Sequence, residues 1–256
     1  MKIHQIRSAT IIVTYNNKRF IIDPWLMPKD YMEGFEAGLN SDIRQPRVEL
    51  PSDFDVNNLN LDAIILTHFH PDHWDEFAQK SLDKDLPFFV QNEFDRDIIK
   101  SQGFSNVRIM SENGTDFGET TLYRTDCQHG RREVIEPVCR QVGMPYDASG
   151  VVFRAANEKT LYVAGDTIWC DEPKNAIDKY SPEVIVINSC GATLKIGERL
   201  IMDIDDVKAI SDYAKNSLII ASHMDTVSHL TVTREDIKSL NLKNVIVPDD
   251  NEVLTF

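Results

Sequence analysis

Cysteine is scarce in this sequence of 256 residues, and its spacing excludes several kinds of protein. The four cysteines form no CxxC pair; they are Cys127, Cys139, Cys170 and Cys190. A disulfide-stapled secreted domain or a cysteine-based zinc module needs closely spaced cysteines. The first residues, MKIHQIRSAT, also lack the apolar segment of a secretory signal peptide. We therefore expect a cytoplasmic protein with reduced thiols.

Positive charge and long apolar runs are also in short supply. Lys and Arg total 27 against 41 Asp and Glu, a formal net charge of -14. Such a chain repels a phosphate backbone, so we expect no nucleic-acid partner. No apolar run approaches the roughly 20 residues that a membrane-spanning helix needs, so we expect no membrane partner. Hydrophobic residues make up 42%, enough for one domain over residues 1–256 without covalent cross-links.

The apolar periodicity predicts an α/β protein. Residues 10–23 alternate around Asn16 and Asn17, and asparagine tolerates the positive φ angles of a two-residue turn, so we expect a β-hairpin. Helical patterns occur at 93–103 and 203–216, and a turn is expected at 112–119. The strand-like runs are LDAIILT (61–67), PFFV (87–90), NVRIM (106–110), TTLYRTD (120–126), VVFRA (151–155), TLYVAG (160–165), PEVIVINS (182–189), SLIIAS (217–222) and NVIV (244–247).

Residues 24–60 break this rhythm, with four prolines and few branched aliphatic residues. Large side chains are scattered through the segment, at Trp25, Met27, Tyr31 and Phe35. A long loop with aromatic residues is more often functional than a linker. Two roles stay open for it: a lid over a substrate site, or an interface in a homo-oligomer. We expect this loop and residues 130–149 to set the choice of substrate.

The densest cluster of polar side chains lies just after the run LDAIILT. His68, His70, Asp72 and His73 form the pattern HxHxDH, followed by an expected helix that begins near Trp74. Imidazole nitrogen and carboxylate oxygen suit divalent metals such as zinc, at roughly 2.0 to 2.2 Å. One ion cannot comfortably take all four, so we assign His68 and His70 to one ion and Asp72 and His73 to another.

Two ions need further ligands, and the ends of other apolar runs supply them. His129 follows TTLYRTDCQ, Asp166 follows TLYVAG, and His223 follows SLIIAS. Ligands gather at strand ends in α/β proteins, so we expect these three to converge on the first cluster. Asp166 or His223 alone could equally be a hydrogen-bonded polar residue or a helix cap. Neither alternative explains the HxHxDH cluster well, because burying so many polar groups without compensation is costly.

Other polar residues are candidates for the surroundings of the site. Asp23, which ends the run FIID, is expected either to orient a ligand histidine or to cap the loop that follows. Asn188 and Cys190 end the run VIVINSCG and should face the site, although a buried cysteine more often fills space. Trp169 and Cys170 follow Asp166 closely and are candidates for its wall.

A phosphorylated substrate would need a basic partner. The candidates are Arg131, Arg132, Lys195 and Arg199. Arginine is favoured because it binds phosphate through two hydrogen bonds. Solvated surface charge is the alternative for each of them. His4 and His229 have no metal-like neighbours in sequence, and we interpret both as structural.

HxHxDH, a later isolated histidine, the segment AGDT and a final histidine after a strand together resemble the metallo-β-lactamase superfamily over essentially the whole chain. The segments ASHMD and LIMDIDDVKAI are similar to the L-ascorbate 6-phosphate lactonase-like hydrolases within it. The resemblance implies a four-layer αββα sandwich. It also implies that His68, His70 and His129 bind the first ion. The ligands of the second ion would be Asp72, His73 and His223, and Asp166 would bridge the two.

The chemistry follows from two divalent ions about 3.5 to 4 Å apart, which can hold a hydroxide between them. That hydroxide attacks a carbonyl or phosphoryl centre, and Asp72 is placed to orient it and shuttle its proton. We expect a binuclear hydrolase that acts on a small-molecule ester or lactone, with or without a phosphate. A phosphodiesterase and a non-catalytic metal-binding sensor or scaffold are the alternatives. Zinc or manganese is favoured by the resemblance, and iron and nickel also fit the ligands.

Overall fold

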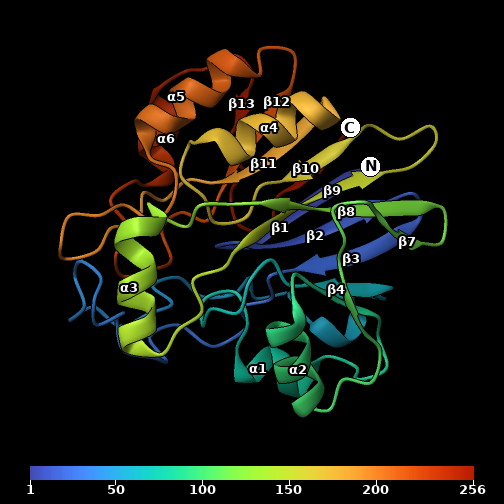
Figure 1. The fold of residues 1–256 in the computed structure, drawn as a ribbon, viewed down its shortest axis with the longest axis horizontal. Helices are drawn as coiled ribbons and strands as arrows, with labels where there is room; N and C mark the ends of the chain where they lie inside the picture. The colour runs from blue at the N-terminus through green and yellow to red at the C-terminus, as the bar shows by residue number, and fades with distance from the viewer.

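Two seven-stranded sheets pack face to face, and helices cover their outer faces (Figure 1). The computed structural model describes residues 1–256, except for the side chain of Val142. Both sheets contain parallel and antiparallel strand pairs. The arrangement confirms the predicted four-layer αββα sandwich. In the described part of the chain, no helix is long and apolar enough to cross a membrane.

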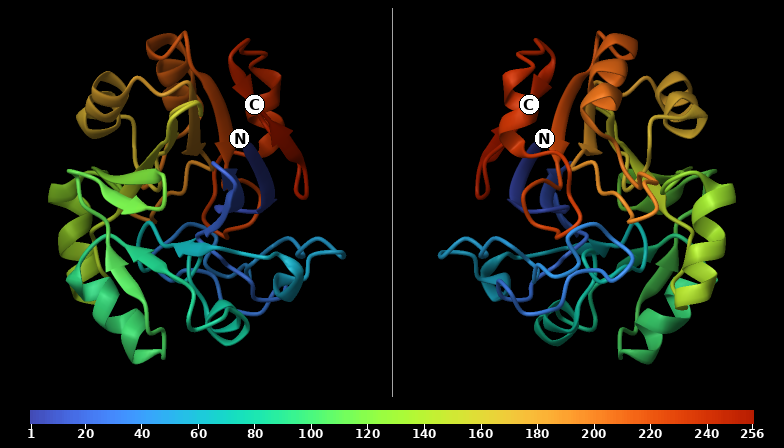
Figure 2. Two further views of the ribbon diagram at one scale, coloured as in Figure 1. Left: turned by 90° about the vertical axis from the view of Figure 1, so that its right-hand side faces the viewer. Right: turned by 90° about the vertical axis from the view of Figure 1, so that its left-hand side faces the viewer.

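The first sheet has the strand order β14-β1-β2-β3-β4-β5-β6. Its strands are β1 (Lys2–Arg7), β2 (Thr10–Tyr15), β3 (Lys18–Ile22), β4 (Ala63–Ile65), β5 (Phe88–Val90), β6 (Val107–Ile109) and β14 (Val253–Thr255). The antiparallel pairing of β14 with β1 brings the two termini close together (Figure 2). From β3 to β6 the strands are parallel, so their carboxyl ends share one edge.

The second sheet has the order β13-β12-β11-β10-β9-β8-β7. Its strands are β7 (Thr115–Phe117), β8 (Thr120–Asp126), β9 (Ser149–Arg154), β10 (Leu161–Val163), β11 (Val184–Asn188), β12 (Leu218–Ser222) and β13 (Val245–Ile246). β8 and β10 both pair antiparallel with β9, and β11 and β12 run parallel to β10. The carboxyl ends of β8, β10, β11 and β12 therefore lie at the same edge.

Six α-helices and one short 3-10 helix, η1 (Val56–Asn58), complete the fold. The α-helices are α1 (Glu76–Ser81), α2 (Glu93–Ser101), α3 (Arg132–Val142), α4 (Asp171–Tyr180), α5 (Ile204–Tyr213) and α6 (Arg234–Ser239). Figure 1 shows α1 and α2 below the first sheet and α4, α5 and α6 above the second. The expected helix near Trp74 begins two residues later, because the side chain of Asp75 accepts a hydrogen bond from the Ala78 amide and caps α1.

Alternation along the strands places apolar side chains in three separate layers of core. On β11, Val184 and Val186 face the other sheet, while Ile185 and Ile187 face the helices. Strands buried on both faces are almost wholly apolar for this reason. The core on the outer face of the first sheet is formed with α1 and α2, and includes Trp74.

The hairpin expected at residues 10–23 is confirmed as β2 and β3. Asn16 and Asn17 form its turn, with φ angles of 47° and 59°. The turn expected at 112–119 is only partly confirmed, because β7 lies within it and pairs antiparallel with β8. Gly118, with φ 63°, supplies the left-handed backbone that lets the chain reverse between these two strands. Three residues are too few for periodicity to reveal such a strand.

Candidate metal centre

The seven candidate ligands come together where strand ends of both sheets meet. They follow the carboxyl ends of β4, β8, β10 and β12. They form two groups, and within each group one ligand atom per residue lies within 4.8 Å of the others. The groups are His68, His70 and His129, and Asp72, His73, Asp166 and His223.

His68 has one ring nitrogen held by the protein and one free. The Thr67 hydroxyl lies 2.8 Å from Asp23 Oδ2 and 3.0 Å from His68 Nδ1. Because the hydroxyl has a single proton, which it donates to the carboxylate, it accepts the proton of His68 Nδ1. Nε2 is then unprotonated, and this buried atom has no hydrogen-bond partner among the described residues. A buried nitrogen with a free lone pair fits a metal ion.

His70 and His129 are oriented by backbone carbonyl groups. His70 Nε2 lies 2.9 Å from the Pro145 oxygen, and His129 Nδ1 lies 3.1 Å from the Leu200 oxygen. Each donates its proton there, which leaves His70 Nδ1 and His129 Nε2 free to bind a metal. Burial lowers the pKa of His70 to about 4 and also lowers the pKa of His129. Both imidazoles are therefore neutral at neutral pH, as metal ligands must be.

The second group has the spacing of ligands around one ion. His73 Nε2 lies 3.2 Å from His223 Nε2 and 3.3 Å from Asp166 Oδ2. Asp72 Oδ2 lies 3.4 Å from His223 Nε2. Two ligand atoms bound tetrahedrally at 2.0 to 2.1 Å lie about 3.3 Å apart, so these contacts match a shared zinc-sized ion.

The charges of this group also favour the binding of a cation. Burial lowers the pKa of His73, but Asp166, Asp23 and Asp72 outweigh it and raise this pKa to about 10. For Asp72, burial raises the pKa, but His73 and His223 outweigh it and hold the pKa well below the ordinary value. Protons on the imidazoles therefore balance the carboxylates when no metal is bound. A divalent ion supplies the same positive charge and releases those protons.

Asp166 lies between the two groups. Its Oδ2 is 3.9 Å from both His68 Nε2 and His129 Nε2, and 3.3 Å from His73 Nε2. Asn188, at the end of β11, donates a hydrogen bond of 2.6 Å to the other oxygen, Oδ1. Asn188 therefore faces the site, as expected, and orients Asp166. One carboxylate is within reach of ligand atoms from both groups.

Asp23 orients a histidine, the first of its two expected roles. Its Oδ2 lies 2.9 Å from His73 Nδ1, and its Oδ1 accepts a hydrogen bond from the Thr67 amide. Ser8, in the turn before β2, lies 3.3 Å from His223 Nδ1 through its hydroxyl. Sequence reasoning missed Ser8 and Thr67, since neither belongs to a spacing pattern. Cys190 is fully buried in the core beside His223, and burial raises its thiol pKa.

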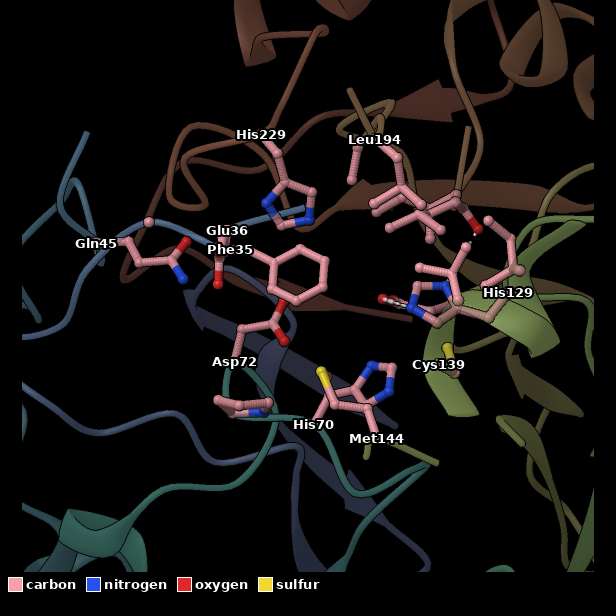
Figure 3. A pocket seen from close by; sticks show the side chains of 18 of the residues that line it. Phe35, Glu36, Gln45, His70, Asp72, His129, Cys139, Met144, Leu194 and His229 are labelled. Carbon is pink, nitrogen blue, oxygen red and sulfur yellow. Dashed lines mark hydrogen bonds and ion pairs between the residues drawn. The ribbon is translucent and has the colours of Figure 1, made fainter. Parts of the chain in front are cut away.

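A cavity of about 280 Å³ opens onto both groups (Figure 3). His70, His129, Asp72, Asp166 and His223 reach it from the ligand groups. Its other walls are largely apolar and come from the loop at 24–60, from residues 135–144 and from residues 192–201. Those apolar residues are Met32, Phe35, Ile135, Val138, Cys139, Met144, Leu194, Leu200 and Ile201. The loop at 24–60 thus forms part of the cavity wall.

Two candidates for the wall lie elsewhere, so that prediction is wrong. Neither Trp169 nor Cys170 lines the cavity. The Trp169 ring packs against Tyr213, with the centroids 5.3 Å apart. The Cys170 thiol donates to the Ile168 carbonyl oxygen, at 3.2 Å. Both side chains are turned into packing around α4 and α5.

The basic candidates for phosphate binding are also held away from the cavity. Arg131 pairs with Glu198, and Arg132 lies near Asp147. Arg199 pairs with Asp203 and Asp206, and Lys195 donates to a backbone oxygen, that of Glu36. Among the described side chains that line the cavity, none is Arg or Lys. By contrast, His229 lines it, although we interpreted it as structural. His4 hydrogen-bonds to Asn251 at 2.8 Å, away from the site.

Comparison with known proteins agrees with this fold and site. A family model described as "Beta-lactamase superfamily domain" matches residues 18–232. The chain belongs to this superfamily, which confirms the broader of the two resemblances in its sequence. It is 38% identical over 262 residues to UPF0173 protein YddR of Bacillus subtilis (strain 168), covering 100% of both chains. A UPF0173 metal-dependent hydrolase of Staphylococcus carnosus (strain TM300) is 22% identical over 244 residues, with 94% and 92% covered.

Two solved structures are similar over their full length. Isothiocyanate hydrolase from Delia radicum gut bacteria has 36% sequence identity and a TM-score of 0.93, with 100% of this chain and 99% of that chain covered. A possible metal-dependent hydrolase from Veillonella parvula DSM 2008 has 39% identity and a TM-score of 0.94, with the same coverage. Both sheets and the segments that carry the candidate ligands therefore have counterparts in experimental structures.

Proposed function

We propose that this protein is a metal-dependent hydrolase that binds two divalent ions and acts on a small uncharged molecule such as an ester or a lactone. The observation that carries the proposal is the position of the two ligand groups beside an apolar cavity. The names of its relatives as metal-dependent hydrolases support the same activity.

The residues divide between the two ions as their geometry suggests. The first ion would be held by His68, His70 and His129, the second by Asp72, His73 and His223, and Asp166 would bridge them. Zinc or manganese suits these nitrogen and oxygen atoms, and iron or nickel would also fit. When bound, the ions would supply a water molecule of lowered pKa and a Lewis acid for the substrate oxygen.

Asp72 is the proposed catalytic residue. It lines the cavity, and its side chain keeps 19% of its surface exposed while its ligand partners are buried. Its carboxylate could accept a hydrogen bond from the attacking water and orient it. As the tetrahedral intermediate collapses, the same carboxylate passes the proton of the water to the leaving group.

The walls of the cavity favour an uncharged substrate. They are apolar, their charged side chains outside the ligand groups are Glu33 and Glu36, and no described lining residue is basic. A phosphate group would lose its hydration without gaining a cationic partner other than the metal ions. The structure therefore favours an ester or lactone without phosphate over the phosphorylated form, and disfavours the phosphodiesterase alternative. A substrate like that of the ascorbate phosphate lactonases would need a phosphate site, and no basic side chain lines the described cavity.

Isothiocyanates are a second candidate class of substrate. The related protein from Delia radicum gut bacteria is named an isothiocyanate hydrolase, and its fold matches this chain throughout. The central carbon of an isothiocyanate is an uncharged electrophile, as an ester carbonyl carbon is. Attack by water, loss of carbonyl sulfide and release of an amine would balance the reaction. An apolar cavity suits the hydrocarbon part of such a molecule.

The test is a hydrolysis screen of protein reconstituted separately with zinc and with manganese. The substrates are an uncharged lactone, an ester, an isothiocyanate, a phosphorylated lactone and a phosphodiester. We expect turnover of at least one uncharged substrate, and a drop in kcat of about 100-fold or more in Asp72→Asn. The matched control is Asp97→Asn, which removes an exposed carboxylate on α2 and should leave kcat unchanged.

Two outcomes would contradict the proposal. Turnover of the phosphodiester alone would favour the phosphodiesterase. Metal bound without turnover of any substrate would favour a sensor or scaffold. Location in the cytoplasm and assembly into a homo-oligomer stay predictions from the sequence.

A further inference from the structure

His229 projects into the cavity from the wall that faces His70 and Asp72 (Figure 3). It lies in the segment after β12, six positions beyond the candidate ligand His223. Its ring packs against Phe35, with the centroids 5.6 Å apart, and only 8% of the residue is exposed. A neighbour from the loop at 24–60 thus holds the imidazole against the cavity.

The backbone around His229 is fixed by the protein, but its side chain lacks hydrogen-bond partners. Its carbonyl oxygen accepts a hydrogen bond from the Thr193 amide at 3.0 Å. Gly38 packs so closely that a Cβ there would lie 2.7 Å from His229 Cβ. Yet the buried Nδ1 atom has no hydrogen-bond partner among the described residues. Nδ1 has almost no accessible surface, so a ligand in the cavity would reach the ring through its other nitrogen, Nε2, which has no hydrogen bond to the described residues.

Gln45 adds a second polar group to this wall. It is 4% exposed, lines the cavity, and accepts a hydrogen bond from the Ser228 amide through Oε1 at 3.0 Å. That contact fixes the amide plane and leaves its NH₂ group as the remaining donor. His229 and Gln45 therefore form, with Glu33 and Glu36, the polar part of a largely apolar wall, across the cavity from the candidate ligands.

We propose that His229 binds the substrate, by a hydrogen bond to a polar atom remote from the carbon that is attacked. This inference rests on the proposed function. It narrows the substrate class to uncharged molecules that carry a hydroxyl, amide or ether group beyond an apolar segment. Burial lowers the pKa of His229 to about 4, so the imidazole is neutral and can donate one hydrogen bond and accept another.

The test measures binding of two amides that resist hydrolysis, phenylacetamide and 4-hydroxyphenylacetamide, by calorimetry on the zinc-loaded protein. Wild type should bind 4-hydroxyphenylacetamide about 10-fold more tightly. With phenylacetamide bound, the buried imidazole has no hydrogen-bond partner. His229→Phe keeps an aromatic ring of similar size and should abolish this preference. His229→Gln keeps a donor and an acceptor and should retain it. Zinc content should be equal in all three proteins.

A second measurement, made on wild type alone, needs neither turnover nor a folded variant. In wild type labelled with ¹⁵N-histidine, the ring nitrogens of His229 should shift with 4-hydroxyphenylacetamide and not with phenylacetamide. Absence of binding, equal binding of the two amides, or an unchanged preference in His229→Phe would overturn the proposal for His229. A screen without turnover, beside an intact binding preference, would instead refute the hydrolase and leave the binding role standing.

Discussion

Single residues outside the HxHxDH motif determine how its histidines are oriented. Asp23 directly follows β3, and it reaches His73 Nδ1 at 2.9 Å and the Thr67 hydroxyl at 2.8 Å. Through Thr67 it also fixes the proton of His68. One carboxylate thus sets the orientation of a histidine in each candidate group.

Asp23→Asn should weaken metal binding. The amide keeps the size of the side chain but loses the charge that favours the orientation and basicity of His73. Loss of such a contact lowers metal affinity by about 10- to 100-fold. Competition with a chromophoric chelator measures this change for zinc, with Asp97→Asn as the control because that carboxylate is exposed. Equal zinc affinities in wild type and Asp23→Asn would show that Asp23 supports the fold only.

At the scale of elements, the long loop at 24–60 is held in place from both sheet and helix. Arg7 of β1 is fully buried and donates to the carbonyl oxygens of Trp25, Met27 and Val48 at 2.8, 3.0 and 2.9 Å. Asp75, the cap of α1, accepts from the Met27 amide. Burial lowers the pKa of Arg7 to about 10, which still leaves it charged at neutral pH. These contacts fix the start of the loop and let residues 32–45 cover the cavity.

Arg7→Met should loosen the loop. It leaves three carbonyl groups without their donor, and we expect the free energy of unfolding to fall by about 3 kcal/mol. Urea unfolding measures this loss, and limited proteolysis should cut within 24–60 faster than in wild type. Arg140→Met is the control, since Arg140 is 80% exposed and its ion pair with Glu136 contributes little. A cost no larger than that of the control would exclude the anchoring role.

At the scale of the molecule, the candidate ligands join the two sheets. His68, His70, Asp72 and His73 follow β4 of the first sheet, while the other candidates follow strands of the second. An ion bound by either group would therefore connect the two sheets at the edge where their strand ends meet.

Removing the metal should lower the thermal stability of the whole chain. At a free zinc concentration about 1,000 times the dissociation constant, binding adds about 4 kcal/mol to the free energy of unfolding. For a chain of this size that corresponds to a rise in Tm of roughly 10 °C. Scanning calorimetry before and after chelation measures it, and His70→Ala should show a smaller rise. A Tm that does not respond to zinc would argue against a structural link between the sheets.

Local sequence patterns determined most of the elements and the cluster of candidate ligands. Alternation and apolar runs marked most strands of both sheets, and Asn16 and Asn17 marked a turn, because these signals depend on residues adjacent in the chain. The HxHxDH cluster was visible for the same reason. The candidates His129, Asp166 and His223 could be found because strand ends meet at one edge of a sheet. The strands β1 and β14 and the helices α3, α4 and α6 were not predicted, and in α3 Pro137 weakens the helical signal.

Only the tertiary structure decided what surrounds the site. The cavity takes its apolar wall from three segments far apart in sequence, and no periodic pattern encodes that meeting. Arg131 and Arg199 looked available to a phosphate until their acidic partners were seen. His229 looked structural until its side chain was found to line the cavity. A side chain's role depends on the atoms within a few ångströms of it, and those atoms are chosen by packing across the whole chain.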